Sequence, residues 1–303
     1  MVSSSDYFRL HFIVGLWSFT AILGILISIP AVEMVLYRTL LAAIAMGIML
    51  YFKKEKEAVG GMDILKMILV GFIVAAHWLS FFASGKVGNA SVSLVGFATA
   101  SLWTAFLEPL FKRKSIQSFE VFLGVVVILG LYIIFSHDFE YPLGLLLGIG
   151  AGLTSALFSV MNAKLVSRHR PFTITFFEMI GAFLGTLLFL PFYRTFLTPD
   201  GILHLIPTLQ DWLLIAVLSL VCTVYAFSVM VDLMKRISVF LIQLTLNLEP
   251  VYGILLAVLI LGEKEKMSWN FYGGTSVILL AVLSYPFIKK INRGNPSLKN
   301  PIP

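Results

Sequence analysis

Charged residues are scarce in this chain, and their scarcity excludes most soluble folds. Only 13% of the 303 residues are Asp, Glu, Lys or Arg, whereas 59% are hydrophobic. A soluble domain carries roughly 25% charged residues. Alternating segments about 10 residues long, which would indicate a membrane β-barrel, are also absent. The composition therefore predicts an all-α integral membrane protein.

Several kinds of chemistry lack the residues they need. The single cysteine, Cys222, allows no internal disulfide. No phosphate-binding loop of the form G-x-x-x-x-G-K-[ST] is present, so the chain would not use ATP by itself. No H-E-x-x-H motif or paired acidic motif supports an intramembrane enzyme, and no histidine or cysteine set has metal-ligand spacing. We therefore expect no catalytic residues, no metal and no cofactor.

Hydrophobic stretches run almost end to end. A spanning helix needs about 20 apolar residues, and ten stretches meet this need. The first is longer than the core of a typical signal peptide, so we count it as a spanning helix. The predicted spans are 8–29, 31–52, 64–85, 89–111, 117–135, 142–163, 171–193, 210–232, 237–261 and 268–288.

The basic residues gather in every second loop. Seventeen of the 22 lie there or near the N-terminus, namely Arg9, Lys53, Lys54, Lys56, Lys66, Lys112, Arg113, Lys114, Lys164, Arg168, Arg170, Lys235, Arg236, Lys289, Lys290, Arg293 and Lys299. The positive-inside rule then places both termini in the cytoplasm. This pattern is an orientation signal that favours contact with membrane lipids over nucleic acid.

The last five stretches echo the first five. Lys86 precedes the fourth predicted span as Lys235 precedes the ninth, and Gly124 matches Gly273, both pairs 149 residues apart. Because five crossings is an odd number, the second copy must insert upside down. Inverted repeats of this kind build the two gates of many secondary transporters.

This echo predicts two repeats and a tail. Residues 1–139 form the first five-helix repeat, and residues 140–290 form the second, inverted repeat. Residues 291–303 contain three prolines and are expected to be a disordered cytoplasmic tail. Glycines spaced by four residues at 144, 148 and 152 indicate close helix packing.

Three motifs carry a resemblance to a known family. They are the segment 37–43 around Tyr37-Arg38, the segment 77–84 that begins His77-Trp78, and Asn247-Leu248-Glu249-Pro250 followed by a Gly-Glu pair at 262–263. The chain resembles the ten-span EamA family of the drug/metabolite transporter superfamily. That resemblance implies a ten-helix basket in which hairpins three–four and eight–nine move and helices five and ten are peripheral. It also implies export of small metabolites without ATP.

Charges inside spans are the strongest single-residue signals, since each costs about 2.5–3.5 kcal/mol at a helix centre. Arg38 would hold a substrate carboxylate or a protein acid, form a structural ion pair, or extend outward to the membrane surface. Glu178, at the repeat-related position, would bind a proton or an amine. Glu249 and Asn247 place polar groups where Pro250 kinks the ninth span. That break is either a gate with a binding site or a kink whose carboxylate bonds a neighbouring helix.

Other polar and aromatic residues fall within the spans. His77 either titrates or hydrogen-bonds a neighbouring helix. Indoles inside a span need a partner for their N–H groups, which a cavity supplies, although each ring could equally serve helix packing. Further side chains with polar ends lie near the middle of the predicted spans. These aromatic and polar candidates are Trp17, Trp78, Trp103, Tyr225, Gln243 and Tyr252.

The leading functional hypothesis is a monomeric secondary transporter of the inner membrane. It would export small organic metabolites, amino acids or related amphipathic compounds, by alternating access. Proton coupling and facilitated diffusion both fit the sequence. The alternative is a flippase of lipid or lipid-linked sugar.

Overall fold

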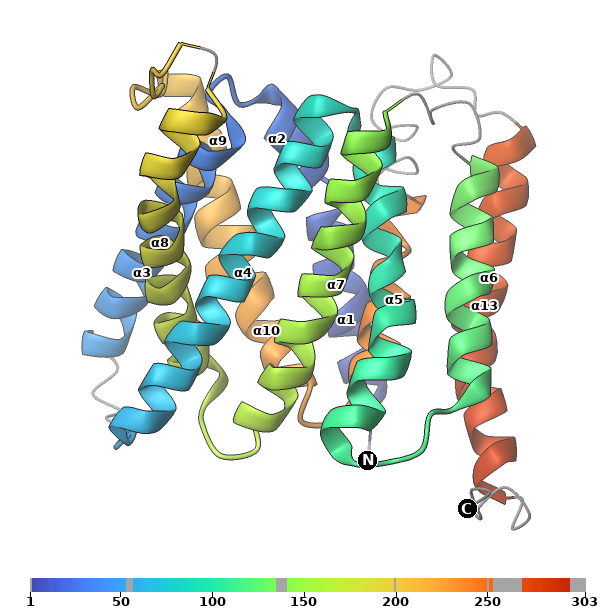
Figure 1. The fold of residues 1–303 in the computed structure, drawn as a ribbon. Helices are drawn as coiled ribbons and strands as arrows, with labels where there is room; N and C mark the ends of the chain where they lie inside the picture. The colour runs from blue at the N-terminus through green and yellow to red at the C-terminus, as the bar shows by residue number, and fades with distance from the viewer. Residues whose placement is uncertain are drawn as a thin grey trace.

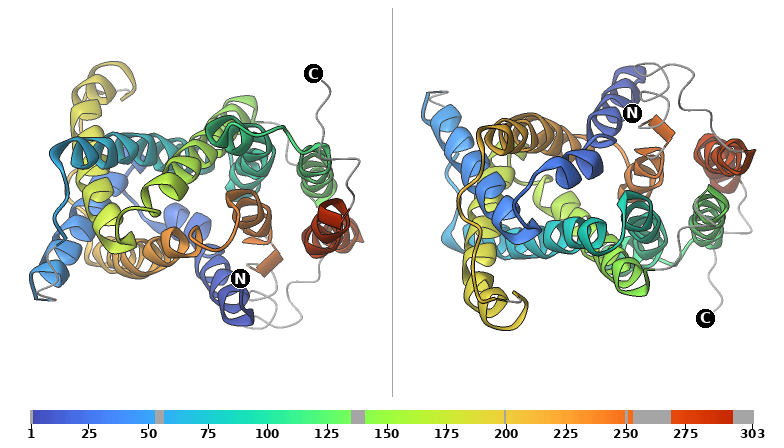
Figure 2. Two further views of the ribbon diagram at one scale, coloured as in Figure 1. Left: turned by 90° about the horizontal axis from the view of Figure 1, so that it is seen from below. Right: turned by 90° about the horizontal axis from the view of Figure 1, so that it is seen from above.

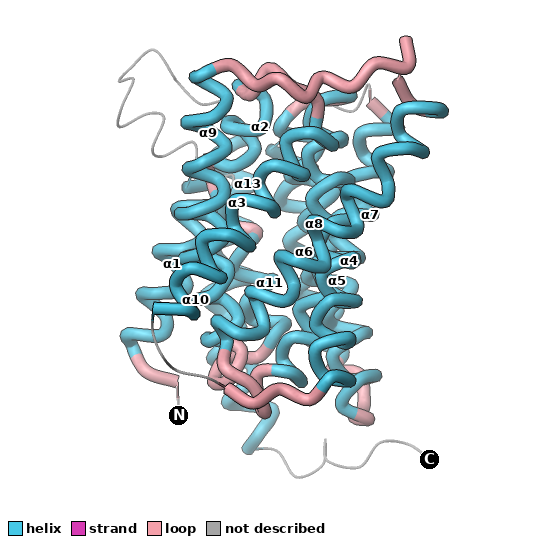
Figure 3. The backbone as a smooth tube through the Cα atoms, turned by 90° about the vertical axis from the view of Figure 1, so that its left-hand side faces the viewer, coloured by secondary structure: helices cyan, strands magenta, loops and turns pink. Residues whose placement is uncertain are grey.

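The computed structural model describes residues 2–52, 57–134, 141–198, 200–249, 251–252 and 269–294. All regular structure in these ranges is helical (Figures 1 and 3). The helices are α1 (Ser4–Trp17), α2 (Thr20–Leu26), α3 (Ala31–Phe52), α4 (Gly61–Val87), α5 (Ala90–Lys112), α6 (Ser118–Ile134), α7 (Pro142–Leu165), α8 (Pro171–Phe196), α9 (Leu209–Ser219), the π-helical segment η1 (Leu220–Tyr225), α10 (Ala226–Leu233), α11 (Val239–Leu246) and α13 (Trp269–Gly294).

Several helices begin at residues that suit a helix start. The Asn89 side chain accepts a hydrogen bond from the Val92 amide at 2.8 Å and so caps α5. Thr208 and Asp211 form a capping box at the start of α9. Pro142 and Pro171 occupy the first positions of α7 and α8, where a missing N–H has no cost.

The predicted all-helical membrane fold is confirmed. Within the described ranges, eight segments are long and apolar enough to cross a membrane, and α6 is a shorter apolar helix at the fifth predicted span. The ninth predicted span starts with α11 and continues outside the described residues. The last helix extends to Gly294, four residues beyond the predicted end of the second repeat. The predicted tail otherwise lies outside the description.

Several contacts join helices at corresponding positions among the first five and the last five predicted spans. The helices of the second and seventh predicted spans pack together as α3 and α8, and those of the fourth and ninth as α5 and α11. Helices α6 and α13, the fifth and tenth spans, lie side by side at the edge of the bundle (Figures 1 and 2). The peripheral place expected for helices five and ten is thus observed.

Glycine permits a close helix approach between α5 and α7. A methyl group added to Gly96 would come within 2.6 Å of the backbone of Gly148, and one added to Gly148 within 3.0 Å of Gly96. Those distances are too short for any side chain. The four-residue glycine spacing in α7 therefore serves packing of two backbones against each other.

Two predicted spans are not continuous α-helices. The first breaks after Trp17, where the Ser18 hydroxyl bonds the Gly15 carbonyl at 2.5 Å and the Thr20 hydroxyl bonds the Trp17 carbonyl at 2.8 Å. Such local bonds compete with the helical ladder. The eighth contains the π-helical turn η1, in which Thr223 bonds the carbonyl of Leu218, five residues earlier.

Candidate functional site

Both irregular spans border an internal cavity. It is lined by residues of α1, α2, α3, α4, α5, α7, η1, α10, α11 and the chain directly after α11. Its volume is about 60 Å³, room for a few water molecules. The lining residues are Trp17, Thr20, Arg38, His77, Trp78, Phe81, Phe82, Phe97, Ser155, Phe158, Cys222, Phe227, Met230, Leu246 and Glu249.

The broken first span and the π-helical turn are joined at the cavity wall. The Trp17 indole N–H donates to the Cys222 carbonyl at 2.8 Å. In membranes, backbone groups freed from a helix are tolerated where they meet other protein or line a cavity. Segments η1 and α1 satisfy this rule for each other. The predicted need of the Trp17 N–H for a partner is therefore met by main chain.

Arg38 is the fixed cation of the cavity. Its side chain is buried, with the residue only 2% exposed. The Nε–H donates to the Thr223 hydroxyl at 2.9 Å. The guanidinium carbon lies 4.0 Å from the centre of the Trp78 ring and 5.6 Å from that of Phe82. These contacts hold the group against aromatic faces, where cations are stabilised.

No carboxylate of the described chain forms an ion pair with Arg38. A structural ion pair and an outward-extended arginine, two of the alternatives for this residue, are therefore not what the structure shows. A buried charge without a counter-ion is costly. The arrangement leaves the cavity ready for an anionic group beside Arg38.

His77 makes the hydrogen bond to a neighbouring helix that was one of its two predicted roles. Its Nδ1 lies 2.9 Å from the Ala151 carbonyl on α7, which is a hydrogen bond to a neighbouring helix. The ring also lines the cavity, and it packs against Phe97 and Phe158 with ring centres 5.5 and 5.4 Å apart. Trp78 packs edge-on against Phe227 at 6.0 Å. Aromatic faces therefore surround the polar groups.

The end of α11 supplies the acidic side of the cavity. Glu249 is 4% exposed and lines the cavity, and its carboxylate bonds no described residue. Asn247 bonds the Gln243 carbonyl one turn back at 3.3 Å. Gln243 donates to the hydroxyl groups of Ser155 and Ser159 on α7 at 3.2 and 2.9 Å. Asn247 and Gln243 thus stand behind the cavity wall, and Pro250 lies outside the described residues.

Three predicted candidates lie away from the cavity. Tyr225 is 47% exposed and packs edge-on against Phe12 on the outer surface. The Tyr252 hydroxyl is 2.6 Å from His11. The Trp103 N–H is buried and finds no partner among the described residues. A position near the middle of a membrane span is therefore not enough to place a side chain at the cavity.

Glu178 occupies a second buried position, apart from the cavity. It is completely buried on α8, and neither carboxylate oxygen has a hydrogen-bond partner within the described chain. Asn162 of α7 makes no hydrogen bond to it, and the Asn162 amide also has no partner within the described chain. An unpaired carboxylate in such surroundings is costly, whereas a protonated carboxyl group is less so.

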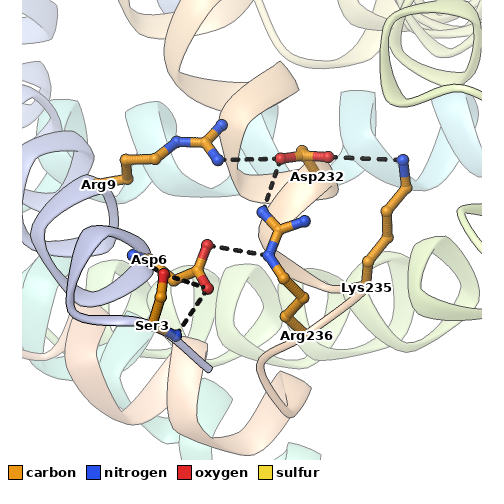
Figure 4. Close-up of polar contacts among 6 residues, drawn as sticks. All are labelled: Ser3, Asp6, Arg9, Asp232, Lys235 and Arg236. Atoms are coloured by element: carbon orange, nitrogen blue, oxygen red, sulfur yellow. Dashed lines mark hydrogen bonds and ion pairs between the residues drawn. The ribbon is translucent and has the colours of Figure 1, made fainter. Parts of the chain in front are cut away.

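Ion pairs close one end of the bundle between its first and eighth spans (Figure 4). This end carries the basic loops and is called the basic end here. Arg9 of α1 pairs with Asp232 of α10 at 3.1 Å, and Arg236 pairs with Asp6 of α1 and with Asp232, both at 2.9 Å. Lys235 approaches Asp232 at 3.5 Å.

Polar contacts at the basic end also join the first turn of α4 and the loop before it to the loop before α8. His169 lies 3.1 Å from both Glu57 and Asp63. Partial burial acts to raise the pKa of Glu57, but hydrogen bonds from Thr173, the Arg170 amide and His169 outweigh it and hold that pKa below its ordinary value.

Neutral and charged hydrogen bonds join helices at the opposite end. The Asp211 carboxylate accepts from the amide and hydroxyl of Ser28, both at 2.6 Å. Lys86 donates to the Ile27 carbonyl at 2.7 Å, and the His204 amide donates to Glu33 at 3.1 Å. Polar contacts therefore join helices at both ends of the bundle, on either side of this small cavity.

Sequence reasoning missed several lining residues. Thr223 positions Arg38 but looks like an ordinary small residue in an apolar run. Phe81 and Phe82 stand in the same segment as His77, so an aromatic cluster one turn beyond that residue was the available signal. Nothing in the sequence indicated the π-helical turn that brings the Cys222 carbonyl to Trp17.

Comparisons with known proteins agree with this architecture. A family model described as EamA-like transporter family matches residues 10–136 and again 142–285. The chain is similar to an uncharacterized transporter, YxxF, of Bacillus subtilis (strain 168), with 21% identity over 249 residues, 79% of this chain and 76% of that protein. It is also similar to a solved structure with the description "Crystal structure of protein". The two superpose with a TM-score of 0.73 at 15% sequence identity, over 96% of this chain and 99% of that one. The latter likeness concerns the fold alone.

Proposed function

Because this chain belongs to the EamA-like transporter family, we propose that it is a secondary transporter exporting small organic metabolites, amino acids or related amphipathic compounds among them. A multi-pass membrane transporter is what the family and the apolar helices support directly. The substrate class, the direction and the mechanism are our inference from the cavity.

The observation that carries the proposal is the Arg38 guanidinium, which lies in an aromatic cavity and forms no ion pair within the described part of the chain. A substrate carboxylate would supply the missing counter-ion, and the planar guanidinium can hold it through two parallel hydrogen bonds. Glu249 lines the same cavity and would attract a substrate amine. The rings of Trp78 and Phe82 offer faces to an apolar side chain. An α-amino acid combines these three features.

The polar contacts at both ends of the bundle support alternating access as the mechanism. At about 60 Å³ the cavity is too small for an amino acid, so one end must open before a substrate enters. At the basic end the pairs of Asp6 and Arg9 with α10 and its following loop would break. At the other end the bonds of Asp211 to Ser28 would break. We infer that hairpins three–four and eight–nine provide this movement.

Coupling to protons has three candidate groups in Glu178, Glu249 and His77. Glu178 is the strongest because both of its oxygens are buried without a partner in the described chain. Binding of a proton there would remove a buried charge and favour one conformation of the carrier. Transport driven only by the substrate gradient remains the second mode.

The position in the cell is part of the same proposal. The basic end would face the cytoplasm, as the positive-inside rule requires, with both termini on that side of the inner membrane. The cavity lies within one chain, so a monomer suffices for transport.

Counterflow in proteoliposomes tests the proposal. Purified protein is reconstituted, loaded with one unlabelled metabolite at a time, and assayed for uptake of labelled solute with and without a pH gradient. We expect saturable counterflow by one class of compounds bearing a carboxylate and an amine. If no solute in a panel of amino acids and related metabolites exchanges, the proposal fails.

A further inference from the structure

A large cleft opens at the basic end, separate from the substrate cavity. Its volume is about 470 Å³. Its walls come from the end of α5, the loop to α6, the start of α6, the loop between α10 and α11, and α13. The cleft therefore lies where the peripheral pair of α6 and α13 meets the rest of the bundle. None of its lining residues lines the cavity around Arg38.

Basic side chains dominate this cleft. Five basic residues line it, namely Lys112, Lys114, Lys235, Arg236 and Lys289. Two acidic residues line it, Glu108 and Glu120.

Both carboxylates are already engaged. Glu108 accepts from Lys112 at 2.5 Å and from the Phe240 amide at 2.9 Å, and Glu120 accepts from the Tyr285 hydroxyl at 3.0 Å. Lys114 has no ion pair within the described part of the chain. Lys235 and Arg236 pair with Asp232, and Arg236 also pairs with Asp6. The five basic residues of the cleft thus outnumber the four carboxylates that lie in it or pair with it by one.

The inner wall of the cleft is held in place by a chain of polar contacts. The Lys289 ammonium donates to the Tyr285 hydroxyl at 2.6 Å, and lies 3.4 Å from the hydroxyl of Ser238. Tyr285 in turn donates to Glu120, which joins α13 to α6. These contacts fix the positive charge of Lys289 at the cleft wall.

The flank of the cleft is apolar and outward-facing. Leu110 follows the lining residue Pro109 and is 69% exposed, and Phe122 lies two residues after Glu120 and is 63% exposed. On α13, Phe287 and Ile291 on either side of Lys289 are 71% and 69% exposed. In a membrane protein such surfaces meet lipid chains. The helices that wall the cleft thus also carry exposed surface suited to acyl chains.

We propose that this cleft binds the phosphate-bearing headgroup of an anionic phospholipid, whose acyl chains lie along α5, α6 and α13. A free phosphate would satisfy the basic groups but not the apolar flank. The site would hold α6 and α13 against the bundle from the basic end. It does not depend on the identity of the transported substrate.

Thermal unfolding in detergent tests this site, with bound lipid counted by native mass spectrometry. The purified full chain is titrated with phosphatidylglycerol, phosphatidylcholine or inorganic phosphate. We expect saturable stabilisation and a retained lipid with phosphatidylglycerol only. Equal stabilisation by inorganic phosphate would overturn the lipid assignment, and equal stabilisation by phosphatidylcholine would overturn the need for an anion.

A charge-matched pair of variants locates the site. Each basic side chain near an anionic lipid surface contributes about fivefold to affinity. The double variant Lys114→Gln/Lys235→Gln should therefore bind phosphatidylglycerol roughly 25-fold more weakly. The control Lys164→Gln/Arg168→Gln removes the same charge at the same end, outside the cleft, and should bind as the unchanged protein does. An equal loss in both double variants would show attraction to net charge and refute the site.

Discussion

Replacing Asp232 with asparagine should open the basic end of the transporter. This carboxylate lies at the centre of the ion-pair network in Figure 4, with Arg9, Arg236 and Lys235 at 3.1, 2.9 and 3.5 Å. Only the pair with Arg9 crosses directly from α1 to α10. The pair with Arg236 is local, but it orients Arg236 toward Asp6 of α1.

The size of the effect follows from exposure. The Asp232 side chain is 25% exposed and that of Arg9 is 36% exposed, so solvent and salt screen their attraction. A pair of this kind contributes about 0.2–1 kcal/mol. With Arg236 also less well oriented, the closed state should lose on the order of 1 kcal/mol, which is about a fivefold change in the population that is open.

The single cysteine reports this opening. Cys222 lines the substrate cavity and is 2% exposed, so a thiol reagent reaches it only when an end opens. In vesicles with the basic end outward, a membrane-impermeant maleimide should label Asp232→Asn about fivefold faster than the unchanged protein. High salt should narrow the difference because it weakens the pairs in the unchanged protein.

Two controls make the result interpretable. Cys222→Ser should not be labelled. Asp63→Asn removes a carboxylate at the same end that contacts Lys66 and His169 rather than α1, and should leave the labelling rate unchanged. Equal rates for Asp232→Asn and the unchanged protein, both folded, would refute the role of the network as a closure.

Three further results are expected. Glu178→Gln should make transport insensitive to a pH gradient while exchange at equal pH persists; a gradient response equal to that of the unchanged protein would remove Glu178 from coupling. Glu57→Gln should lower thermal stability at pH 7, and this effect should fade as the pH falls through the lowered pKa of Glu57, because a carboxyl group with a lowered pKa stabilises the fold fully above its ordinary value of about 4.3 and loses that contribution below it; a difference independent of pH would contradict this. Gly148→Leu should abolish folding or lower the melting temperature strongly, since even a methyl group there would press on Gly96; normal stability by thermal shift would show that α5 and α7 separate easily.

Much of the fold could be predicted from the sequence because membrane insertion depends on simple patterns. Apolar length marked the spans, and the alternation of basic loops marked their direction. The breaks could not be predicted in the same way. The interruption after Trp17 depends on two hydroxyl groups, and the π-helical turn depends on packing of Cys222 and Thr223 against other helices.

The candidate residues illustrate a second limit. Arg38, Trp78 and Glu249 were chosen for depth and chemistry, and the structure places all three at one cavity. Tyr225 has a similar depth but lies on the outer surface. Depth is set by position along a helix, whereas direction depends on how the helix is rotated against its neighbours. An apolar sequence with few polar residues defines that rotation poorly.

The most direct test of the central claim measures how Arg38 discriminates between substrates. Counterflow of a transported amino acid and of its carboxamide is compared in the unchanged protein, in Arg38→Lys and in Arg38→Gln, with Thr223→Val as a variant that only frees the guanidinium. We predict that the unchanged protein prefers the carboxylate and that Arg38→Lys keeps part of this preference. Arg38→Gln should lose the preference and transport the carboxylate at least tenfold more slowly, because a charge-assisted hydrogen bond contributes about 1.5–3 kcal/mol. Carboxylate transport by Arg38→Gln at the rate and with the preference of the unchanged protein would contradict the account.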